Sequence, residues 1–492
     1  MRLNTVQQVE ILNIFHGTKK MEIQGDDILF SNFNYNPDYY YFLYVGDLKT
    51  YTLNSFVKET LDRRIFGREV RFVAIVPDVC LQYNYSNIIV INPVSSADMI
   101  ANHTFSEHEK PPKMSCRISS KRFMTAVSES DSIRALIDTI LDNQNQLYIN
   151  MYESVVEMTL DEIDRVAILG PDKHIARHYN NKIVQYKELQ GIVPLIEGTT
   201  CKGLESLLEI TATYRKEWED GVFVSAAYSA AGANSAVTHS DEEVARRFTD
   251  DSCEYLVTRY VPHELDPTVL AVVANENEVY IAGIADQKIV DGNKFVGSSF
   301  PSMVTEKQSD ELHKYTVAVG KVLGKAGYRG IFGCDYLIDL DGNILFLEIN
   351  ARKQGTTLEF CYTLEQSLPE GAPMLPELEY CAVIESTFPS HTMEMKGNIR
   401  GIHWGTYNHK LADEQVTTGY IPQNPYERET FKKVARKELL KDFVILEHLG
   451  TNLKVMPGTF LARVVSVARS HEDVNEGLCQ GVGFIMQTIQ DN

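Results

Sequence analysis

The chain has 492 residues, of which 44% are apolar and 23% charged, and a formal net charge of −20. Such a composition is typical of a globular protein with two to four domains. The acidic balance disfavours nucleic-acid binding, which needs a basic face, and no run approaches the roughly 18 apolar residues of a membrane span. We therefore expect neither a nucleic acid nor a membrane as partner.

The N-terminal residues contain no sustained apolar segment of the kind found in signal peptides. The eight cysteines are scattered, without a CxxC motif or a Cys/His pair at zinc spacing. We therefore expect reduced thiols in a cytoplasmic protein.

The N-terminal part alternates short apolar runs with helix-like segments over residues 39–102. Apolar runs of about four to eight residues that end at Gly, Pro or Asp are typical of buried parallel strands. We predict an α/β domain over residues 1–150, with a long surface loop over residues 104–122. A helix is expected to begin at Ser130 or Asp131.

The central part, residues 151–390, has an α+β pattern. Residues 174–190 have helical periodicity, and "GIVPLIEG" directly after them predicts a strand. Further strands are predicted at "GVFVSAAYS", "YLVTRYV", "TVLAVVAN" and "EVYIAGIAD". Residues 309–328 predict an amphipathic helix that ends at Gly327.

The pattern becomes polar and mixed after about residue 390. Short strands with Gly and Pro turns are followed by a helix at "HEDVNEGLCQGVGFIMQTI". We predict a C-terminal domain over residues 391–492, and the sequence does not indicate its role. The aromatic and histidine residues of "GIHWGTYNH" are compatible with a substrate pocket and with a core.

The segment "GCDYLIDLDGNILFLEINAR" predicts a hairpin, because Asp341-Gly342 lies between alternating apolar runs. With a two-residue turn at that dipeptide, Ile338 pairs with Leu345. The same register places Asp335 directly opposite Glu348. The apolar face expected to join the core comprises Tyr336, Ile338, Leu340, Leu345, Leu347 and Ile349.

Like charges directly opposite each other destabilise a sheet, and a cation between Asp335 and Glu348 removes that repulsion. Two carboxylates and the Asn350 amide are hard oxygen ligands that suit Mg²⁺, which completes its shell with phosphate oxygens and water. Arg352 lies two positions after Asn350, and therefore on the same face if the strand continues, where a guanidinium can contact a phosphoryl group. Two alternatives remain at this point: acids that simply face solvent, and a calcium loop, although Leu337 stands where that loop needs an acid.

Residues 327–357 resemble the C-terminal signature of the ATP-grasp superfamily through their D-x12-E-x-N-x-R arrangement. The resemblance implies an ATP-grasp fold in the central part, after a Rossmann-like pre-grasp domain and before an appended C-terminal domain. It implies ATP and Mg²⁺ as cofactors, with Mn²⁺ as an alternative metal. It makes Asp335, Glu348 and Asn350 metal ligands, and makes Arg352 a catalytic contact to the transferred phosphate.

The resemblance also implies phosphate contacts upstream. "NNKIVQYKELQGIVPLIEG" is similar to the family segment in which a lysine at a helix start binds phosphate. Its spacing selects Lys182 as a catalytic and nucleotide-binding residue, with Lys173 as the alternative.

The nucleotide-covering lid is expected over roughly residues 180–260. Within it, Ser225 stands where the family has a lysine, and only Gly232 remains in a loop that is usually rich in glycine for phosphate contact. Lys288 is the candidate substitute for the missing lysine.

"YLVTRYVPHELDPTV" is similar to the family hinge, in which backbone groups bind adenine and an acid binds the ribose. The resemblance assigns Val257 to the backbone contact. It assigns Asp266 to the ribose, with Glu264 as a second nucleotide-binding acid. Gln287 lies in a segment that resembles a site-facing strand and receives no role.

The usual chemistry of the family is carboxylate activation, in which a substrate carboxylate attacks the γ-phosphate of ATP to give an acyl phosphate. The resemblance implies a ligase that joins a carboxylate to the amine of an amino acid or small peptide in specialised metabolism. A thiol ligase that loads a carrier protein, a kinase and an inactive nucleotide-binding module are the alternatives. The oligomeric state stays open, a homodimer included.

Overall fold

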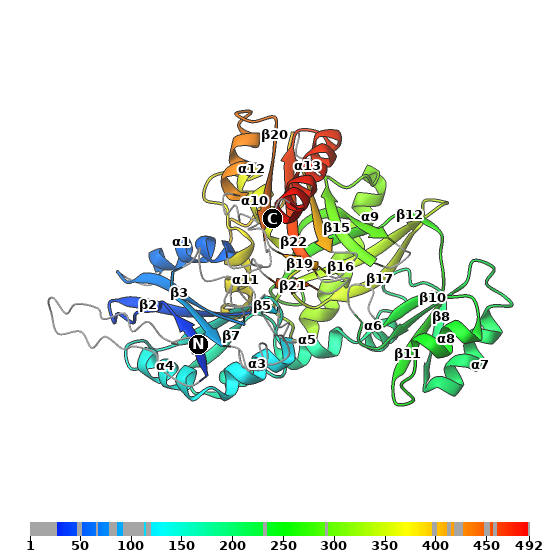
Figure 1. The fold of residues 1–492 in the computed structure, drawn as a ribbon, viewed down its shortest axis with the longest axis horizontal. Helices are drawn as coiled ribbons and strands as arrows, with labels where there is room; N and C mark the ends of the chain where they lie inside the picture. The colour runs from blue at the N-terminus through cyan, green and yellow to red at the C-terminus, as the bar shows by residue number, and fades with distance from the viewer. Residues whose placement is uncertain are drawn as a thin grey trace. The chain divides into compact units, whose positions relative to one another are not determined.

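The computed structural model divides into two compact units, residues 1–169 and 170–492 (Figure 1). It describes residues 27–46, 52–64, 67–77, 86–91, 113–114, 120–229, 234–290, 294–395, 401–410, 415–417, 427–446, 453–455 and 460–490. No helix within these ranges is long and apolar enough to cross a membrane. No disulfide joins the cysteines of the same ranges, which are Cys201, Cys253, Cys334, Cys361, Cys381 and Cys479.

The first unit contains, in its described residues, a six-stranded sheet in the order β1-β4-β3-β2-β6-β7. Its strands are β1 (Ile28–Ser31), β2 (Tyr39–Val45), β3 (Glu69–Val76), β4 (Ile88–Ile91), β6 (Leu147–Met151) and β7 (Val166–Leu169). The short strand β5 (Lys113–Met114) is not part of this sheet. Only β1 runs antiparallel to its neighbour, and the pairs among the other strands are parallel. The predicted α/β architecture is confirmed.

Helices cover this sheet because its strands are apolar on both faces. The helices are α1 (Asn54–Arg64), α3 (Ser120–Glu129) and α4 (Asp131–Leu141), with a 3-10 turn at Leu160–Glu162. Apolar side chains of α3 and α4 share a core with the odd-numbered residues of β2. The Ser130 hydroxyl caps α4 by accepting from the backbone of Ile133 at 3.1 Å, as the sequence predicts. Most of the loop predicted over residues 104–122 lies outside the described residues.

The second unit begins with two short helices and a small antiparallel sheet in the order β10-β9-β11-β8. Its elements are α5 (Lys173–Tyr179), α6 (Lys182–Glu188), β8 (Gly198–Lys202), α7 (Leu204–Tyr214), β9 (Val222–Ala226), β10 (Ser235–Thr238), α8 (Asp241–Arg247) and β11 (Glu254–Arg259). Side chains of α7 and α8 pack on one face of this sheet around Trp218. The segment predicted as a lid therefore comprises α6 and the small sheet, and its closure stays a prediction.

Two sequence expectations fail here. The continuous helix over residues 174–190 is interrupted, because the side chain of Asn181 accepts from the backbone of Ile183 at 2.9 Å and starts α6 anew. "GIVPLIEG" is not a strand, and only Leu195 forms an isolated bridge, to Phe346.

A nine-stranded sheet in the order β12-β16-β13-β14-β15-β18-β22-β20, with β17 beside β16, is the larger sheet described in this unit. Its first members are β12 (His263–Leu265), β13 (Pro267–Val273), β14 (Val279–Val290), β15 (Lys294–Phe300), β16 (Gly330–Asp339) and β17 (Ile344–Asn350). Helix α9 (Glu306–Lys325) packs on one face, opened by a capping box at Thr305 and followed by Gly327 at φ +91°.

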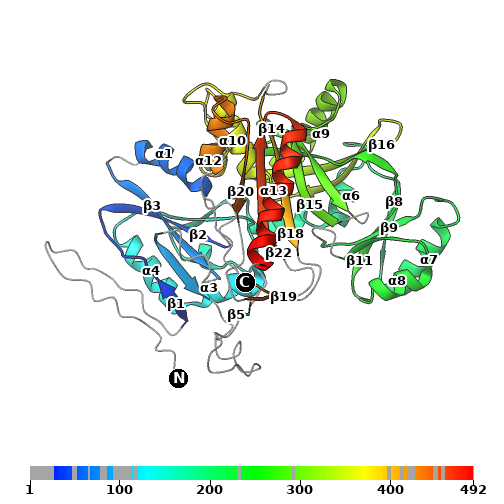
Figure 2. The same cartoon turned by 45° about the horizontal axis from the view of Figure 1, so that its top comes forward.

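Three strands of the C-terminal part, β18, β22 and β20, extend this same sheet, whereas β19 and β21 pair with each other outside it. The elements of this part are α10 (Thr357–Ser367), α11 (Leu375–Ile384), β18 (His403–Lys410), β19 (Gln415–Thr417), α12 (Glu427–Ala435), β20 (Lys441–Leu446), β21 (Leu453–Val455), β22 (Phe460–Ala468) and α13 (His471–Gln490). Figure 2 shows α13 lying along β22 and β18, in agreement with their shared core. Trp404 is fully buried and stacks on Phe300. A subdivision into domains 1–150, 151–390 and 391–492 stays a prediction.

Candidate nucleotide and metal site

The β16–β17 hairpin places Asp335 directly opposite Glu348, as predicted from the sequence. The turn is longer than the predicted two residues: β16 ends at Asp339 and β17 begins at Ile344. The Asp339 carboxylate holds this turn by accepting from the backbone of Asn343 at 2.8 Å, and Gly342 adopts φ +84°.

The register predicted nearer the turn is wrong. Ile338 pairs with Ile344 instead of Leu345, because the pairing shifts by one residue between Asp335 and Tyr336. Leu347 is the extra residue of this bulge, and bulges of this kind are common beside active sites.

The bulge exchanges the faces of β17, so the predicted apolar face is only partly correct. Ile344 and Phe346 join the core with Tyr336 and Ile338. Leu347 is 39% exposed and Leu340, in the turn, is 64% exposed. The turn shifts the register by one residue from the predicted one, and the extra residue Leu347 shifts it back before Glu348. The pairing of Asp335 with Glu348 therefore agrees with the prediction, although the turn does not.

Asp335 is buried and its carboxylate is surrounded by donors from three segments. One oxygen accepts from the Thr268 hydroxyl at 2.6 Å and from the Gln354 amide at 3.2 Å. The other oxygen accepts from the Asn350 amide at 2.8 Å. These bonds fix the orientation of the carboxylate.

Glu348 is held by a cation. The ammonium of Lys182 forms an ion pair with its carboxylate, and the two side chains are 16% and 22% exposed. Removal of water around the ammonium lowers the pKa of Lys182 to about 8; Asp335 opposes this shift and Arg352 adds to it. Lys182 thus supplies the positive charge that two facing carboxylates need.

The junction between α5 and α6 places Lys182 against β17. The Gln185 side chain brackets the backbone of Ile349, accepting from its N–H at 2.7 Å and donating to its carbonyl at 2.9 Å. Asn180 accepts from the backbone of Ala351 at 2.9 Å. Lys182, the first residue of α6, therefore has a fixed position beside Glu348.

The residues that follow β17 lie close to the predicted metal ligands. Arg352 donates to the side-chain oxygen of Asn350 at 2.8 Å and to the Lys353 carbonyl at 2.9 Å. The Lys353 ammonium pairs with Glu379 of α11 at 2.7 Å, and both are buried. Arg352 is thus in direct contact with one predicted metal ligand.

The donor set fits Mg²⁺. No three His, Cys, Asp or Glu side chains gather into a possible metal cluster in the described ranges. Two carboxylates with one amide suit Mg²⁺, which is commonly bound through one or two carboxylates plus substrate phosphates. Asp335, Glu348 and Asn350 are the residues that would hold it, and the observation that favours it is that these oxygen donors lie together beside the cationic groups of Lys182 and Arg352.

The residues predicted to contact the nucleotide from the lid are Ser225, Gly232 and Val257. Ser225 is buried in β9, and its hydroxyl lies 2.9 Å from that of Ser229. Gly232 lies outside the described residues. The side chain of Val257 is fully buried in the core of the small sheet and its strand is paired on both edges, and its assignment to the nucleotide stays a prediction. Val261, four residues after Val257, packs against Leu337, which lies two residues after Asp335 in β16.

The two predicted ribose acids differ in their surroundings. Glu264 is exposed on β12. Asp266 pairs with His263 at 3.0 Å, and this bond raises the pKa of His263, helped by the Val261 carbonyl 2.7 Å from its other ring nitrogen.

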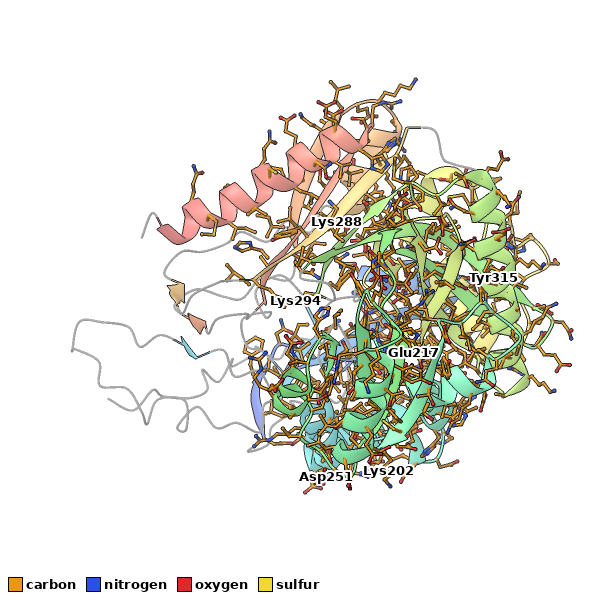
Figure 3. All side chains as sticks on the ribbon, turned by 90° about the vertical axis from the view of Figure 1, so that its right-hand side faces the viewer. Lys202, Glu217, Asp251, Lys288, Lys294 and Tyr315 are labelled. Atoms are coloured by element: carbon orange, nitrogen blue, oxygen red, sulfur yellow. The ribbon has the colours of Figure 1, made fainter. Side chains whose placement is uncertain are left out.

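The other predicted lysines and Gln287 have these positions. Lys173 is the buried first residue of α5. Lys288 donates to Asn475 of α13 at 3.3 Å, and Figure 3 labels it among the strands beside that helix. Gln287 is half-buried on β14, where its backbone donates to the Asp266 carbonyl at 2.8 Å.

Sequence reasoning missed Thr268, Gln354 and Gln185. The Thr268 contact depends on the pairing of β13 with β16, which joins strands far apart in the chain. Gln354 lies in the loop that follows the quoted hairpin, where strand alternation no longer applies. The segment containing Gln185 was identified, but nothing in its spacing indicates a contact with β17.

A family model described as an ATP-grasp domain matches residues 179–356. The chain is 23% identical over 209 residues to "[Butirosin acyl-carrier protein]--L-glutamate ligase" of Niallia circulans, covering 40% of this chain and 49% of that protein. It is 26% identical over 125 residues to "L-propargylglycine--L-glutamate ligase" of Streptantibioticus cattleyicolor, covering 25% of each. The chain thus aligns with half or less of the length of these relatives.

The fold is similar to that of the biotin carboxylase domain of Hydrogenobacter thermophilus 2-oxoglutarate carboxylase, solved with MgADP, ADP and bicarbonate. The TM-score is 0.61 at 14% identity, covering 90% of each chain. The matched residues 179–356 include α6, the small sheet and the β16–β17 hairpin, with every predicted metal ligand. Residues 179–356 of the chain therefore form an ATP-grasp domain.

Proposed function

We propose that the chain is an ADP-forming, ATP- and Mg²⁺-dependent ligase that joins a carboxylate to an amine through an acyl phosphate. The observation that carries this proposal is the pairing of Asp335 with Glu348, beside the cationic groups of Lys182 and Arg352. Facing acids next to two cations suit a metal-bound polyphosphate.

The residues have distinct roles in this proposal. Asp335, Glu348 and Asn350 would hold Mg²⁺, which would neutralise charge on the phosphates of ATP. Lys182 and Arg352 offset the charge that develops on the transferred phosphoryl group. Thr268 and Gln354 keep the Asp335 carboxylate in one orientation. The lid formed by the small sheet excludes water from the reactive intermediate.

The reaction has two steps. An oxygen of the substrate carboxylate attacks the γ-phosphorus, the bond to the β–γ bridging oxygen breaks, and ADP leaves with that electron pair. The amine nitrogen then attacks the acyl carbon, inorganic phosphate leaves, and the amine gives up a proton. The protein contributes mainly positioning and charge neutralisation.

L-glutamate is the first substrate to test, because both relatives are named as L-glutamate ligases. ADP release would be measured with L-glutamate, with each of the other amino acids and with pairs of them, in the presence and absence of hydroxylamine. An acyl phosphate gives a hydroxamate, whereas a kinase gives a stable phosphate ester and no hydroxamate. The absence of ADP release with every substrate would favour an inactive nucleotide-binding module.

A second candidate is a carboxylate–thiol ligase that loads an amino acid onto a carrier protein. The relative named for an acyl-carrier protein favours it. N-acetylcysteamine, a small thiol surrogate, separates the two candidates: a thiol ligase yields a thioester with it, and an amine ligase yields an amide only with an amine. A homodimer also stays a prediction.

A further inference from the structure

A buried ion pair joins the C-terminal strand β22 to the start of α10. Arg463 and Glu359 have side chains that are 3% and 0% exposed, and they form a salt bridge. The same guanidinium donates to the backbone carbonyl of Gly355 at 2.7 Å. A residue from the part of the chain without an assigned role therefore holds the loop that follows the metal-binding hairpin.

This loop continues from Gly355 directly to Asp335. The backbone of Gln354 donates to the Thr357 hydroxyl at 2.9 Å, and its carbonyl accepts from the backbone of Thr357 at 3.1 Å, so the two residues form one turn. The Gln354 side chain donates from this turn to Asp335 and, at 2.9 Å, to Thr268. The contact from Arg463 to Gly355 thus lies one residue from the contact to Asp335.

The direction of the Gln354 amide follows from chemistry. An ionised carboxylate only accepts hydrogen bonds, so the NH₂ group must face Asp335 and the oxygen must face away. That buried oxygen has no hydrogen-bond partner among the described residues, and neither has the buried hydroxyl of Thr356. Two buried polar atoms of the loop therefore lack hydrogen bonds within the described residues. The hydrogen bond from Arg463 of β22 to the Gly355 carbonyl holds the loop backbone.

Burying an ion pair between a strand and a helix requires the removal of water from both charges, and hydrophobic residues of similar volume often stabilise such a contact as well or better. Glu359 lies in the first turn of α10, where its charge is favourable and offsets the guanidinium. What an apolar pair cannot supply is a donor to the Gly355 carbonyl. The charge of Arg463 is therefore better explained by that donor than by packing.

We propose that Arg463 is a positioning residue for the metal site: through Gly355 and Gln354 it fixes the carboxylate of Asp335, so that the C-terminal part completes the nucleotide site. This inference rests on the proposed Mg²⁺-dependent binding of ATP. It assigns the C-terminal strands a role beyond extending the sheet.

The test uses the full chain with Arg463 and Glu359 both replaced by methionine, which removes the donor without leaving either charge unpaired. The matched control is Arg428→Met, because Arg428 of α12 also pairs with α10, through Glu365, at a position beyond the first turn. Binding of a fluorescent ATP analogue would be titrated with and without Mg²⁺, alongside thermal unfolding.

We expect the double variant to fold and to need about tenfold more Mg²⁺ for nucleotide binding, the usual effect of losing a group that orients a metal ligand. Binding of the analogue in EDTA should change little, and the control should retain the native Mg²⁺ dependence. A folded double variant with native Mg²⁺ dependence would overturn the inference and leave the proposed function standing. Absence of Mg²⁺-dependent binding in the unsubstituted protein would overturn both.

Discussion

Lys182 forms an ion pair with Glu348, and Glu348 lies directly opposite Asp335. The ammonium at the start of α6 therefore compensates the charge of two facing carboxylates in β16 and β17. For Lys182 to reach a phosphate and for Glu348 to bind a metal, this ion pair has to separate. In the proposed function, binding of MgATP would replace one positive charge beside Glu348 by another, which would limit the electrostatic cost of the exchange.

Replacing Glu348 by glutamine should abolish turnover while the protein stays folded. The amide keeps the shape but removes the negative charge that a hard cation prefers. The substitution breaks a mostly buried ion pair, which destabilises the fold, and also relieves the repulsion from Asp335, which stabilises it, so we expect the two effects to offset each other in part and the protein to stay folded. ADP release and thermal unfolding would measure the two effects, and full activity at ordinary Mg²⁺ concentrations would contradict the assignment.

The nucleotide affinity should decrease as the pH rises through about 8. The pKa of Lys182 is lowered to about 8 by burial, so its ammonium loses its proton near that pH and no longer attracts phosphate. Titration of ATP binding between pH 7 and pH 9.5, at constant ionic strength, would measure the midpoint.

Lys182→Arg is the control for this titration, because a guanidinium stays protonated over the whole range. Its affinity should be independent of pH across the same interval. A decrease with the same midpoint in this variant would show that another group titrates.

In the β16–β17 hairpin, the sequence predicts the strands and the pairing of the two acids but not the bulge. The Asp-Gly dipeptide and the alternating apolar runs predict two adjacent strands, and the pairing of Asp335 with Glu348 is confirmed. The bulge at Leu347 could not be predicted, because apolar residues occupy every position of β17 from Ile344 to Leu347 and alternation is lost there. The burial of Phe346 therefore became visible only in the structure.

The side chains that orient the carboxylates were beyond sequence reasoning for a different reason. Thr268 approaches Asp335 across the pairing of β13 with β16, and Gln185 reaches β17 from a helix more than a hundred residues earlier in the chain. Local patterns carry no information on such contacts. The continuous helix predicted over residues 174–190 failed because an asparagine cap outweighed the helical period.

The register of β17 can be tested by truncating neighbouring residues. Phe346→Ala should cost about 3–5 kcal/mol of unfolding free energy, because its ring is buried against Tyr336 in the core. Leu347→Ala should cost less than about 1 kcal/mol, because that side chain is 39% exposed. Chemical denaturation would measure both, and a reversed order would restore the register predicted from the sequence.

The pair of His263 and Asp266 should make stability depend on pH near neutrality. The pKa of His263 is raised above its usual 6.5 by Asp266, so the folded state binds the proton more tightly than the unfolded state. The stabilisation is complete below pH 6.5 and is lost as the pH rises through the folded pKa. We expect the unfolding free energy to decrease across that window, and to decrease less in Asp266→Asn, both measured by denaturation at closely spaced pH values.

Gly333→Ala should weaken the metal site from within the sheet. A Cβ at Gly333 would lie 2.0 Å from the amide carbon of Gln354, so that side chain must leave its place beside Asp335. Gln354 is buried, and its displacement should cost about 1–3 kcal/mol of stability and raise the Mg²⁺ concentration needed for nucleotide binding. Adding Gln354→Ala removes the clash, so the double variant should regain stability. It should not regain Mg²⁺ affinity, since the donor to Asp335 is still missing, and recovery of both would show that Gln354 only fills space.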